Sequence, residues 1–177
     1  MLLVIAAVVA RAPSSLHQSF ILVALGLSLV GDIFLMLSDR WFSPGLVAFL
    51  GALSAYAVAF AFQAPLGLGL FAYVIYPLVP GLAALGWLWP HLRSFRVPVL
   101  VYVFVMSSMI LFAIARLSNN ELSIAGRGLG VVGAALFMLS DTLVARRRFV
   151  APAAPYAVEL GAYFAAQWCL ASTTWLR

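Results

Sequence analysis

Two of the five carboxylates in this chain stand inside long apolar stretches, where an ionisable side chain is costly and is therefore a functional hypothesis by default. Asp32 lies within "LSLVGDIFLML" and Asp141 within "ALFMLSDTLVA", and each follows a small residue that allows another backbone or a substrate to come close. No basic residue lies deep in these stretches, so we expect the two carboxyls to share a proton or to reach loop arginines. One neutral acid beside one anion is suited to acid catalysis.

The tetrapeptide "MLSD" occurs twice, at 36–39 and 138–141, but its two aspartates are not equivalent. Asp39 adjoins the turn sequence "RWFSPG", so we predict a solvated loop charge at this position. Glu121, within "LSNNELS", is predicted to be a loop charge for the same reason. The useful pairing is therefore Asp32 with Asp141, which lie at matching depth, one to two turns before the loops that follow their segments.

Polar side chains on two later segments are predicted to join the aspartates as substrate-binding residues. Tyr102 and Glu159 each lie about one turn into a segment that starts from the same side of the membrane. Tyr163 and Gln167 follow Glu159 at spacings of four, which places all three on one helical face. For Gln167, a hydrogen bond to a neighbouring helix explains the residue equally well.

All the basic residues are arginine, and they lie mostly between apolar runs. Six of them fall in loops on one side of the predicted bundle, which favours that side as cytoplasmic. Arg146 and Arg147 are candidates to bind the phosphate of an anionic lipid. The six are Arg40, Arg93, Arg96, Arg146, Arg147 and Arg148, against Arg11, Arg116, Arg127 and Arg177 elsewhere. The net charge of +5 thus indicates anionic lipid as the partner and makes nucleic acid an unlikely one.

The elements that must position these residues are membrane helices. The chain is 66% hydrophobic and 8% charged, with a mean hydropathy of +1.12, which a soluble domain could not tolerate. We predict an all-α, polytopic transmembrane helix bundle that forms a single domain over 1–177 in the cell (inner) membrane. The seven predicted spans, of which the first is short, are 2–10, 20–37, 44–62, 66–90, 97–116, 124–144 and 156–176. Pro77 and Pro80 predict a kink or an unwound turn in the fourth.

The histidines and the cysteine predict neither a metal site nor a disulfide within the chain. His17 and His91 are predicted to lie in loops without clustered ligands, so no metal and no cofactor is expected. Cys169 is a single cysteine inside the last apolar run, which is typical of a small core residue.

The motifs that carry these residues resemble the lysoplasmalogenase, or YhhN-like, family of multi-pass membrane proteins. They occur in order as "GDIFLML", "GLVAFLGALSAYAVAF", "RVPVLVYVFVMSSMILFA", "GAALFMLSDTLVARRRF" and "AYFAAQ". The resemblance implies hydrolysis of the vinyl ether bond of a lysophospholipid, the lysoplasmalogen, to a fatty aldehyde and a glycerophospho-head-group. It also implies that Asp32 and Asp141 are the catalytic aspartates, whereas Tyr102, Tyr163 and Gln167 occupy the family's recurring polar positions.

The chain departs from the family pattern in two places. The family usually opens with a further helix and a Lys-Pro motif, whereas this sequence begins at "MLLVIAAVVA", so seven spans stand where eight are expected and the start is interpreted as truncated. The family usually has a histidine three residues before Tyr56, where this chain has Leu53. A helper for substrate or proton is therefore missing from this position.

Acid catalysis fits the implied substrate in depth as well as in chemistry. A lysolipid with its phosphate near the loop arginines would hold its ether roughly 5–10 Å deeper, about one to two helical turns, where the aspartates lie. A small proton-coupled lipid or solute transporter is the alternative, because paired intramembrane aspartates beside a Pro-broken helix also describe a coupling site. A purely structural scaffold is the third interpretation, and the sequence leaves the oligomeric state open.

Overall fold

The computed structural model describes residues 1–9, 15–65, 67–151 and 155–176, and every regular element in these ranges is a helix, as predicted. The α-helices are α1 (Leu2–Val9), α2 (Leu16–Met36), α3 (Phe42–Ala61), α4 (Ile75–Leu88), α5 (Arg96–Ala115), α6 (Ile124–Phe149) and α7 (Tyr156–Ser172). Short 3-10 helices join them: η1 (Asp39–Trp41), η2 (Leu68–Tyr73), η3 (Trp89–His91), η4 (Arg93–Phe95) and η5 (Arg116–Ser118).

Within the described ranges, four helical segments are long and apolar enough to cross a membrane, namely Leu16–Met36, Asp39–Ala61, Arg93–Ser118 and Ile124–Phe149. α7 has 17 residues and α4 has 14, both below the ~20 that a straight span needs. α1 has 8 residues and rises only about 12 Å. These lengths support a multi-pass membrane protein, but they do not confirm the seven predicted spans.

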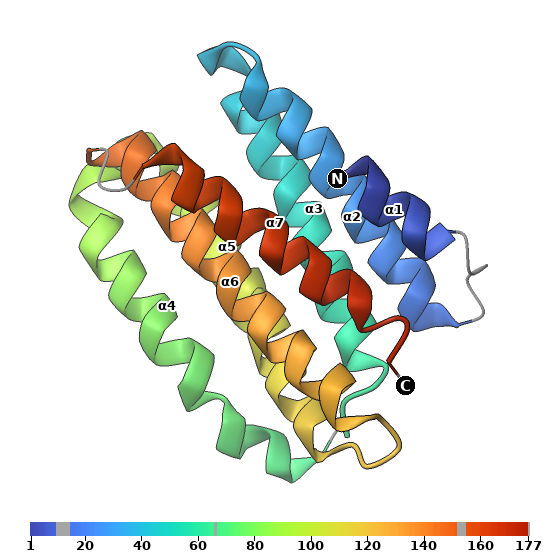
Figure 1. Cartoon of the computed structure of the whole chain (residues 1–177). Helices are drawn as coiled ribbons and strands as arrows, with labels where there is room; N and C mark the ends of the chain where they lie inside the picture. The colour runs from blue at the N-terminus through green and yellow to red at the C-terminus, as the bar shows by residue number, and fades with distance from the viewer. Residues whose placement is uncertain (10–14, 66, 152–154, 177) are drawn as a thin grey trace.

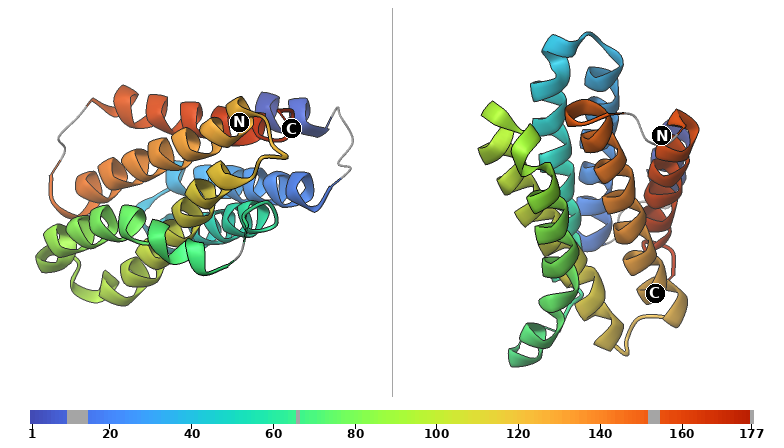
Figure 2. Two further views of the ribbon diagram at one scale, coloured as in Figure 1. Left: turned by 90° about the horizontal axis from the view of Figure 1, so that it is seen from below. Right: turned by 90° about the vertical axis from the view of Figure 1, so that its left-hand side faces the viewer.

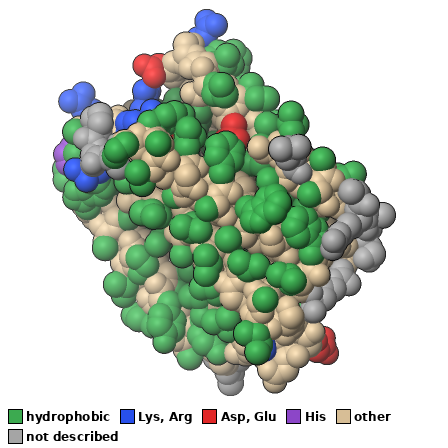
Figure 3. Space-filling view, viewed as in Figure 1, with side chains coloured by type: hydrophobic (Ala, Val, Ile, Leu, Met, Phe, Trp, Pro, Cys, Tyr) green, Lys and Arg blue, Asp and Glu red, His purple; other side chains and the backbone are tan. Residues whose placement is uncertain are grey.

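The helices form two closely packed pairs, α2 with α3 and α6 with α7, and α5 contacts α3, α4 and α6 (Figure 1). α4 lies at the edge of the bundle and packs mainly on α5, whereas α1 lies beside α2 and α7 (Figure 2). Arginines gather at one end of the molecule, and apolar side chains cover most of the visible face (Figure 3). We call this the arginine-rich end, defined by Arg40, Arg93, Arg96, Arg146, Arg147 and Arg148; Arg11 and Arg177, which the sequence places elsewhere, lie outside the described residues.

Local sequence explains where the helices of the site begin and end. The hydroxyl of Ser123 accepts a hydrogen bond from the backbone N–H of Gly126 and caps the start of α6. α6 runs past the predicted end at residue 144 to Phe149, so the arginine triplet lies in its last turn and not in a loop. Cations are favoured there because the helix dipole is negative at that end. α7 begins after Pro155 with Glu159 in its first turn, where an anion is favoured.

Two sequence-based predictions about irregular segments are wrong, the first in part. Of the predicted kink or unwound turn, the unwound turn is excluded, because α4 is helical through Pro77 and Pro80 and the irregular turn is η2, which precedes them; a kink at Pro80 stays a prediction. Pro77 lies in the first turn, where its missing N–H is not needed. His17 is not in a loop but is buried in α2, with Nδ1 at 3.0 Å from the Ala59 carbonyl and Nε2 at 3.1 Å from Thr173 Oγ1.

The core beside the site is aromatic and tightly packed. Phe49, Phe137 and Tyr163 meet edge to face, with ring centroids 5.8–6.4 Å apart. Gly31 faces the ring of Phe49 so closely that an added Cβ would lie 2.6 Å from Phe49 Cε2. The small residue before Asp32 therefore allows α2 to approach α3 at the depth of the aspartate.

Candidate active site

A cavity of about 600 Å³ lies between α2, α3, α4, α5, α6 and α7, in the half of the bundle nearer the arginine-rich end. Its walls are mainly apolar, but six of the predicted site residues line it: Asp32, Tyr102, Asp141, Arg147, Glu159 and Tyr163. The structure thus brings together residues from four helices, and these residues lie up to 131 positions apart in the sequence. Their catalytic or binding roles remain predictions.

Each aspartate accepts a hydrogen bond from a tyrosine on another helix. The hydroxyl of Tyr102, on α5, donates to Asp141 Oδ2 over 2.6 Å. The hydroxyl of Tyr163, on α7, donates to Asp32 Oδ2 over 3.0 Å. The two phenol-to-carboxylate bonds orient both acids and leave one oxygen of each uninvolved in hydrogen bonds within the described residues.

This arrangement corrects the expectation that the carboxyls share a proton or reach loop arginines. Within the described part of the chain, Asp32 and Asp141 form hydrogen bonds to neither each other nor an arginine. The physical reason is that a phenol satisfies a carboxylate oxygen in an apolar wall without introducing a second charge that would itself need solvation. The two acids therefore face a common cavity as separate groups.

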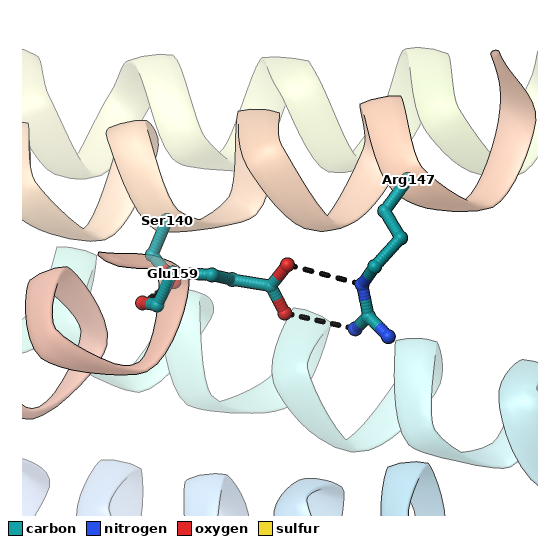
Figure 4. A network of polar contacts seen from close by, with 3 residues as sticks. All are labelled: Ser140, Arg147 and Glu159. Carbon is teal, nitrogen blue, oxygen red and sulfur yellow. Dashed lines mark hydrogen bonds and ion pairs between the residues drawn. The ribbon is translucent and has the colours of Figure 1, made fainter. Parts of the chain in front are cut away.

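Glu159 is held in an ion pair and is not a free cavity carboxylate (Figure 4). Arg147 donates from Nε to Oε2 over 3.1 Å and from Nη2 to Oε1 over 2.8 Å, which is a bidentate arrangement. The hydroxyl of Ser140 donates to the backbone carbonyl of Glu159 over 3.1 Å. These contacts join α6 to α7 and neutralise the buried carboxylate, whose side chain is only 9% exposed.

Two other predicted substrate-binding residues do not line the cavity. Arg146 is exposed and lies over the ring of Trp87, with its guanidinium carbon 5.8 Å from the ring centroid. Gln167 is fully buried behind the cavity wall, where its Oε1 accepts a 2.5 Å hydrogen bond from the hydroxyl of Tyr56. Glu159, Tyr163 and Gln167 do share one buried face of α7, as their spacing predicts.

The two predicted loop carboxylates lie on the surface. Asp39, in η1, has a side chain that is 89% exposed and pairs with Arg148 over 2.7 Å. Glu121 is exposed in the turn between η5 and α6. The repeated tetrapeptide therefore places one aspartate at the surface and the other in the cavity, which confirms the separation made from the sequence.

Sequence reasoning missed the pairing of Arg147 with Glu159 and the contact of Tyr56 with Gln167. A signal for the first was present. A connection of only a few residues makes α6 and α7 antiparallel neighbours, so an arginine near the end of one lies level with a carboxylate near the start of the other. No comparable signal existed for Tyr56, because its partner lies 111 positions away and the contact depends on how α3 packs in the bundle.

Comparison with protein families matches residues 1–174 with the YhhN family. The chain belongs to the YhhN family. Two relatives, both named lysoplasmalogenase, come from Mycobacterium bovis and Mycobacterium tuberculosis, and each is 30% identical over 160 residues. The matched residues cover 85% of this chain and 58% of each relative, so the chain spans little more than half of their length. No solved structure matches the chain significantly.

One departure of this chain from the pattern expected of the YhhN family can now be placed. Leu53, at the position where a histidine is expected, is fully buried in α3 and does not line the cavity. It lies one turn before Tyr56, in the layer that holds Gln167. Leu53 is therefore a packing residue of α3 and not part of the cavity lining.

Proposed function

We propose that this YhhN-family chain is a membrane hydrolase that cleaves the vinyl ether bond of lysoplasmalogens by acid catalysis. The observation that supports the proposal best is a pair of aspartates, Asp32 and Asp141, each oriented by a tyrosine and both facing one mainly apolar cavity. The name of the mycobacterial relatives agrees with this chemistry.

The reaction needs one proton donor and one anion. The neutral acid protonates the β-carbon of the vinyl ether, and the electrons of the double bond form the new C–H bond. The adjacent carbon becomes an oxocarbenium ion, which the other carboxylate stabilises while it orients a water molecule. Water adds to this carbon and loses a proton to a carboxylate. The hemiacetal then loses its hydroxyl proton and the glycerol oxygen gains one as the C–O bond breaks, which releases the aldehyde and the alcohol.

The arginine-rich end supplies a place for the phosphate of the substrate. Arg147 lines the cavity six residues after Asp141 on α6, which is about 9 Å along the helix axis. Its Nε and Nη2 hold Glu159, and no hydrogen bond within the described residues uses its Nη1. A phosphate bound at Nη1 would place the ether bond of a lysolipid near the depth of the two aspartates.

Purified protein in detergent, supplied with vinyl-ether, alkyl-ether and ester lysolipids in parallel, tests the proposal. We expect fatty aldehyde from the vinyl ether and no cleavage of the other two, because an alkyl ether has no double bond to protonate and release of fatty acid from an ester needs an activated nucleophile and an oxyanion site. The rate is expected to fall as the pH rises, because the neutral acid then ionises and can no longer donate its proton. Absence of aldehyde from folded protein would contradict the proposal.

The transporter hypothesis gives a different result in the same preparation. Protein that releases no aldehyde but moves lysolipid or protons across vesicles in an Asp32-dependent and Asp141-dependent manner would support it. We propose the cell (inner) membrane as the location and anionic lipid as the surrounding partner, with the arginine-rich end on the cytoplasmic side.

A further inference from the structure

α4, at the edge of the bundle, and α5 have an apolar groove between them. The groove has a volume of about 390 Å³ and shares only Val103 and Ser107 with the aspartate cavity. Its lining is apolar apart from Ser107, and the lining residues Leu82 and Phe104 are 56% and 72% exposed. Both walls and the connection between them belong to the continuously described range 67–151. An acyl chain is the apolar ligand that a bilayer supplies to such a groove.

A stacked pair, Arg96 with Trp89, lies in line with this groove at its arginine-rich end. Trp89 has helical backbone angles and follows Leu85, a lining residue of α4, by four positions. Arg96 precedes Leu100, a lining residue of α5, by four positions. Spacings of four keep residues on one face of a helix, so both members of the pair continue the faces that form the groove. The guanidinium carbon of Arg96 lies 5.2 Å from the centroid of the Trp89 ring.

Arg96 forms no ion pair within the described residues, in contrast to Arg147 and Arg148, which each pair with a carboxylate. No acidic residue lies between positions 40 and 120, a range that includes α4, α5 and the connection between them. The same connection carries a second arginine, Arg93. Stacking on a ring face leaves the N–H donors at the edge of a guanidinium available. This end of the groove therefore attracts an anion from outside the chain.

The length of the groove face fits one leaflet of a bilayer. Ser107 follows Arg96 by 11 residues on α5, which is about 16 Å along the helix axis. One leaflet contributes roughly half of the ~30 Å hydrocarbon core. A lipid whose phosphate lies at Arg96 can therefore extend an acyl chain along the whole groove.

We propose that a phospholipid with a net negative charge binds in this groove, with its phosphate at Arg96 and one acyl chain between α4 and α5. The site is separate from the aspartate cavity and does not depend on the reaction proposed there. A zwitterionic phospholipid brings its own cation close to Arg93 and Arg96, so the site discriminates against it. Because α4 packs mainly on α5 (Figure 2), a lipid that contacts both helices stabilises this wall of the bundle.

Native mass spectrometry of the purified protein, titrated with phosphatidylglycerol or with phosphatidylcholine of identical acyl chains, tests the charge preference. We expect one phosphatidylglycerol to bind about tenfold more tightly, and Arg96→Gln to remove most of this preference, because a charge-assisted hydrogen bond is lost. Arg40→Gln is the matched control, since Arg40 also stacks on a tryptophan, Trp41, at 5.8 Å but lies away from the groove. Wild-type protein without a preference, or equal effects of the two variants, would overturn the proposal.

A phosphatidylglycerol with a diazirine in mid-tail locates the acyl chain. We expect adducts at Leu82 and Phe104. Leu82→Trp fills the groove and should strongly reduce labelling of Phe104, whereas Val79→Trp should leave it unchanged. Val79 lies on the same helix and is equally exposed, at 56%, but it lines neither the groove nor the cavity. Labelling spread evenly over all lipid-facing helices, or equal effects of the two variants, would contradict a bound lipid.

The alternative occupant of the groove is a second copy of the chain. Leu82→Cys, in a Cys169→Ser background, should stay monomeric in oxidised vesicles if a lipid covers the groove. Efficient disulfide dimers of this variant would assign the groove to the second copy and overturn the proposal. All these measurements need no turnover, so failure of the lipid site and failure of the proposed hydrolase are distinguishable. If a variant fails to fold, titration and labelling of the wild-type protein still decide.

Discussion

Asp32 and Asp141 each accept one hydrogen bond from the neutral hydroxyl of a tyrosine, and this type of partner affects whether they can exchange protons. Their tyrosine partners bind Oδ2 and fix the carboxyl planes, while Oδ1 has no hydrogen bond within the described residues. An acid that is oriented by a neutral phenol can still change its protonation state during a reaction. The tyrosines are thus positioning residues for the two aspartates.

Removing either phenol should impair the chemical step more than substrate binding. For Tyr102→Phe and Tyr163→Phe we expect a roughly 10- to 100-fold loss in kcat with KM little changed, because a hydrogen bond to a charged group contributes about 1.5–3 kcal/mol. Tyr73→Phe is the matched control, since Tyr73 bonds the exposed Ser118 away from the cavity. Steady-state kinetics that show a rise in KM alone would instead make the tyrosines substrate-binding residues.

Asp39 should be dispensable despite the repeated tetrapeptide. Its ion pair with Arg148 is solvent-exposed, and exposed pairs contribute little to stability. We expect Asp39→Asn to retain turnover within a few-fold and to melt within a degree or two of wild type. Loss of activity in this variant, with Asp32→Asn active, would contradict the assignment of the cavity aspartates.

At the scale of elements, the bidentate pair between Arg147 and Glu159 joins α6 to α7 beside the cavity. Arg147→Met should lower the melting temperature markedly, because it leaves a buried carboxylate without a partner. Adding Glu159→Gln to this variant should recover most of the lost melting temperature, because the buried charge without a partner is then removed. Thermal unfolding of the two single variants and the double variant measures the coupling, and additive losses would show that the pair is not a structural unit.

The contact between α2 and α3 depends on Gly31. An added Cβ would lie 2.6 Å from Phe49 Cε2, so Gly31→Ala should destabilise the protein by about 1–3 kcal/mol through overpacking. Gly26→Ala, on the same helix, meets nothing within 4 Å and should be neutral or up to about 1 kcal/mol stabilising because alanine favours a helix. Denaturant titration in detergent measures the free energy of unfolding of the two variants. Equal changes in this free energy would refute the close contact at Gly31.

Helices were easier to predict than their ends. The core of each apolar segment proved helical because hydropathy and the lack of strand-like alternation agree over long windows. The end of α6 was misplaced because three arginines were interpreted as a loop, whereas the helix dipole favours cations in a last turn. Histidine was misjudged for a related reason: the polarity of His17 suggests a loop, but a carbonyl and a hydroxyl from other helices satisfy its ring.

For the whole molecule, the sequence predicted that the site residues meet but not how they are bonded. Depth along each segment follows from residue counts, so the common layer of Asp32, Asp141 and Glu159 could be predicted. Rotation of each helix about its axis and its choice of neighbours depend on packing over the entire bundle. The tyrosine contacts across 39 and 131 positions, and the exclusion of Gln167 from the cavity, therefore required the structure.

The site exists only in the assembled bundle, because its two acids come from α2 and α6 and their partners from α7 and α5. The most direct test of the central claim is aldehyde release from a vinyl-ether lysolipid by wild type, Asp32→Asn, Asp141→Asn and the double variant, each shown to be folded. We expect each single variant to lose about 10²-fold or more in turnover and the double variant to be little worse, since the two acids act as one unit. If either single variant releases aldehyde at the rate of the wild-type protein, the two aspartates are not the catalytic pair.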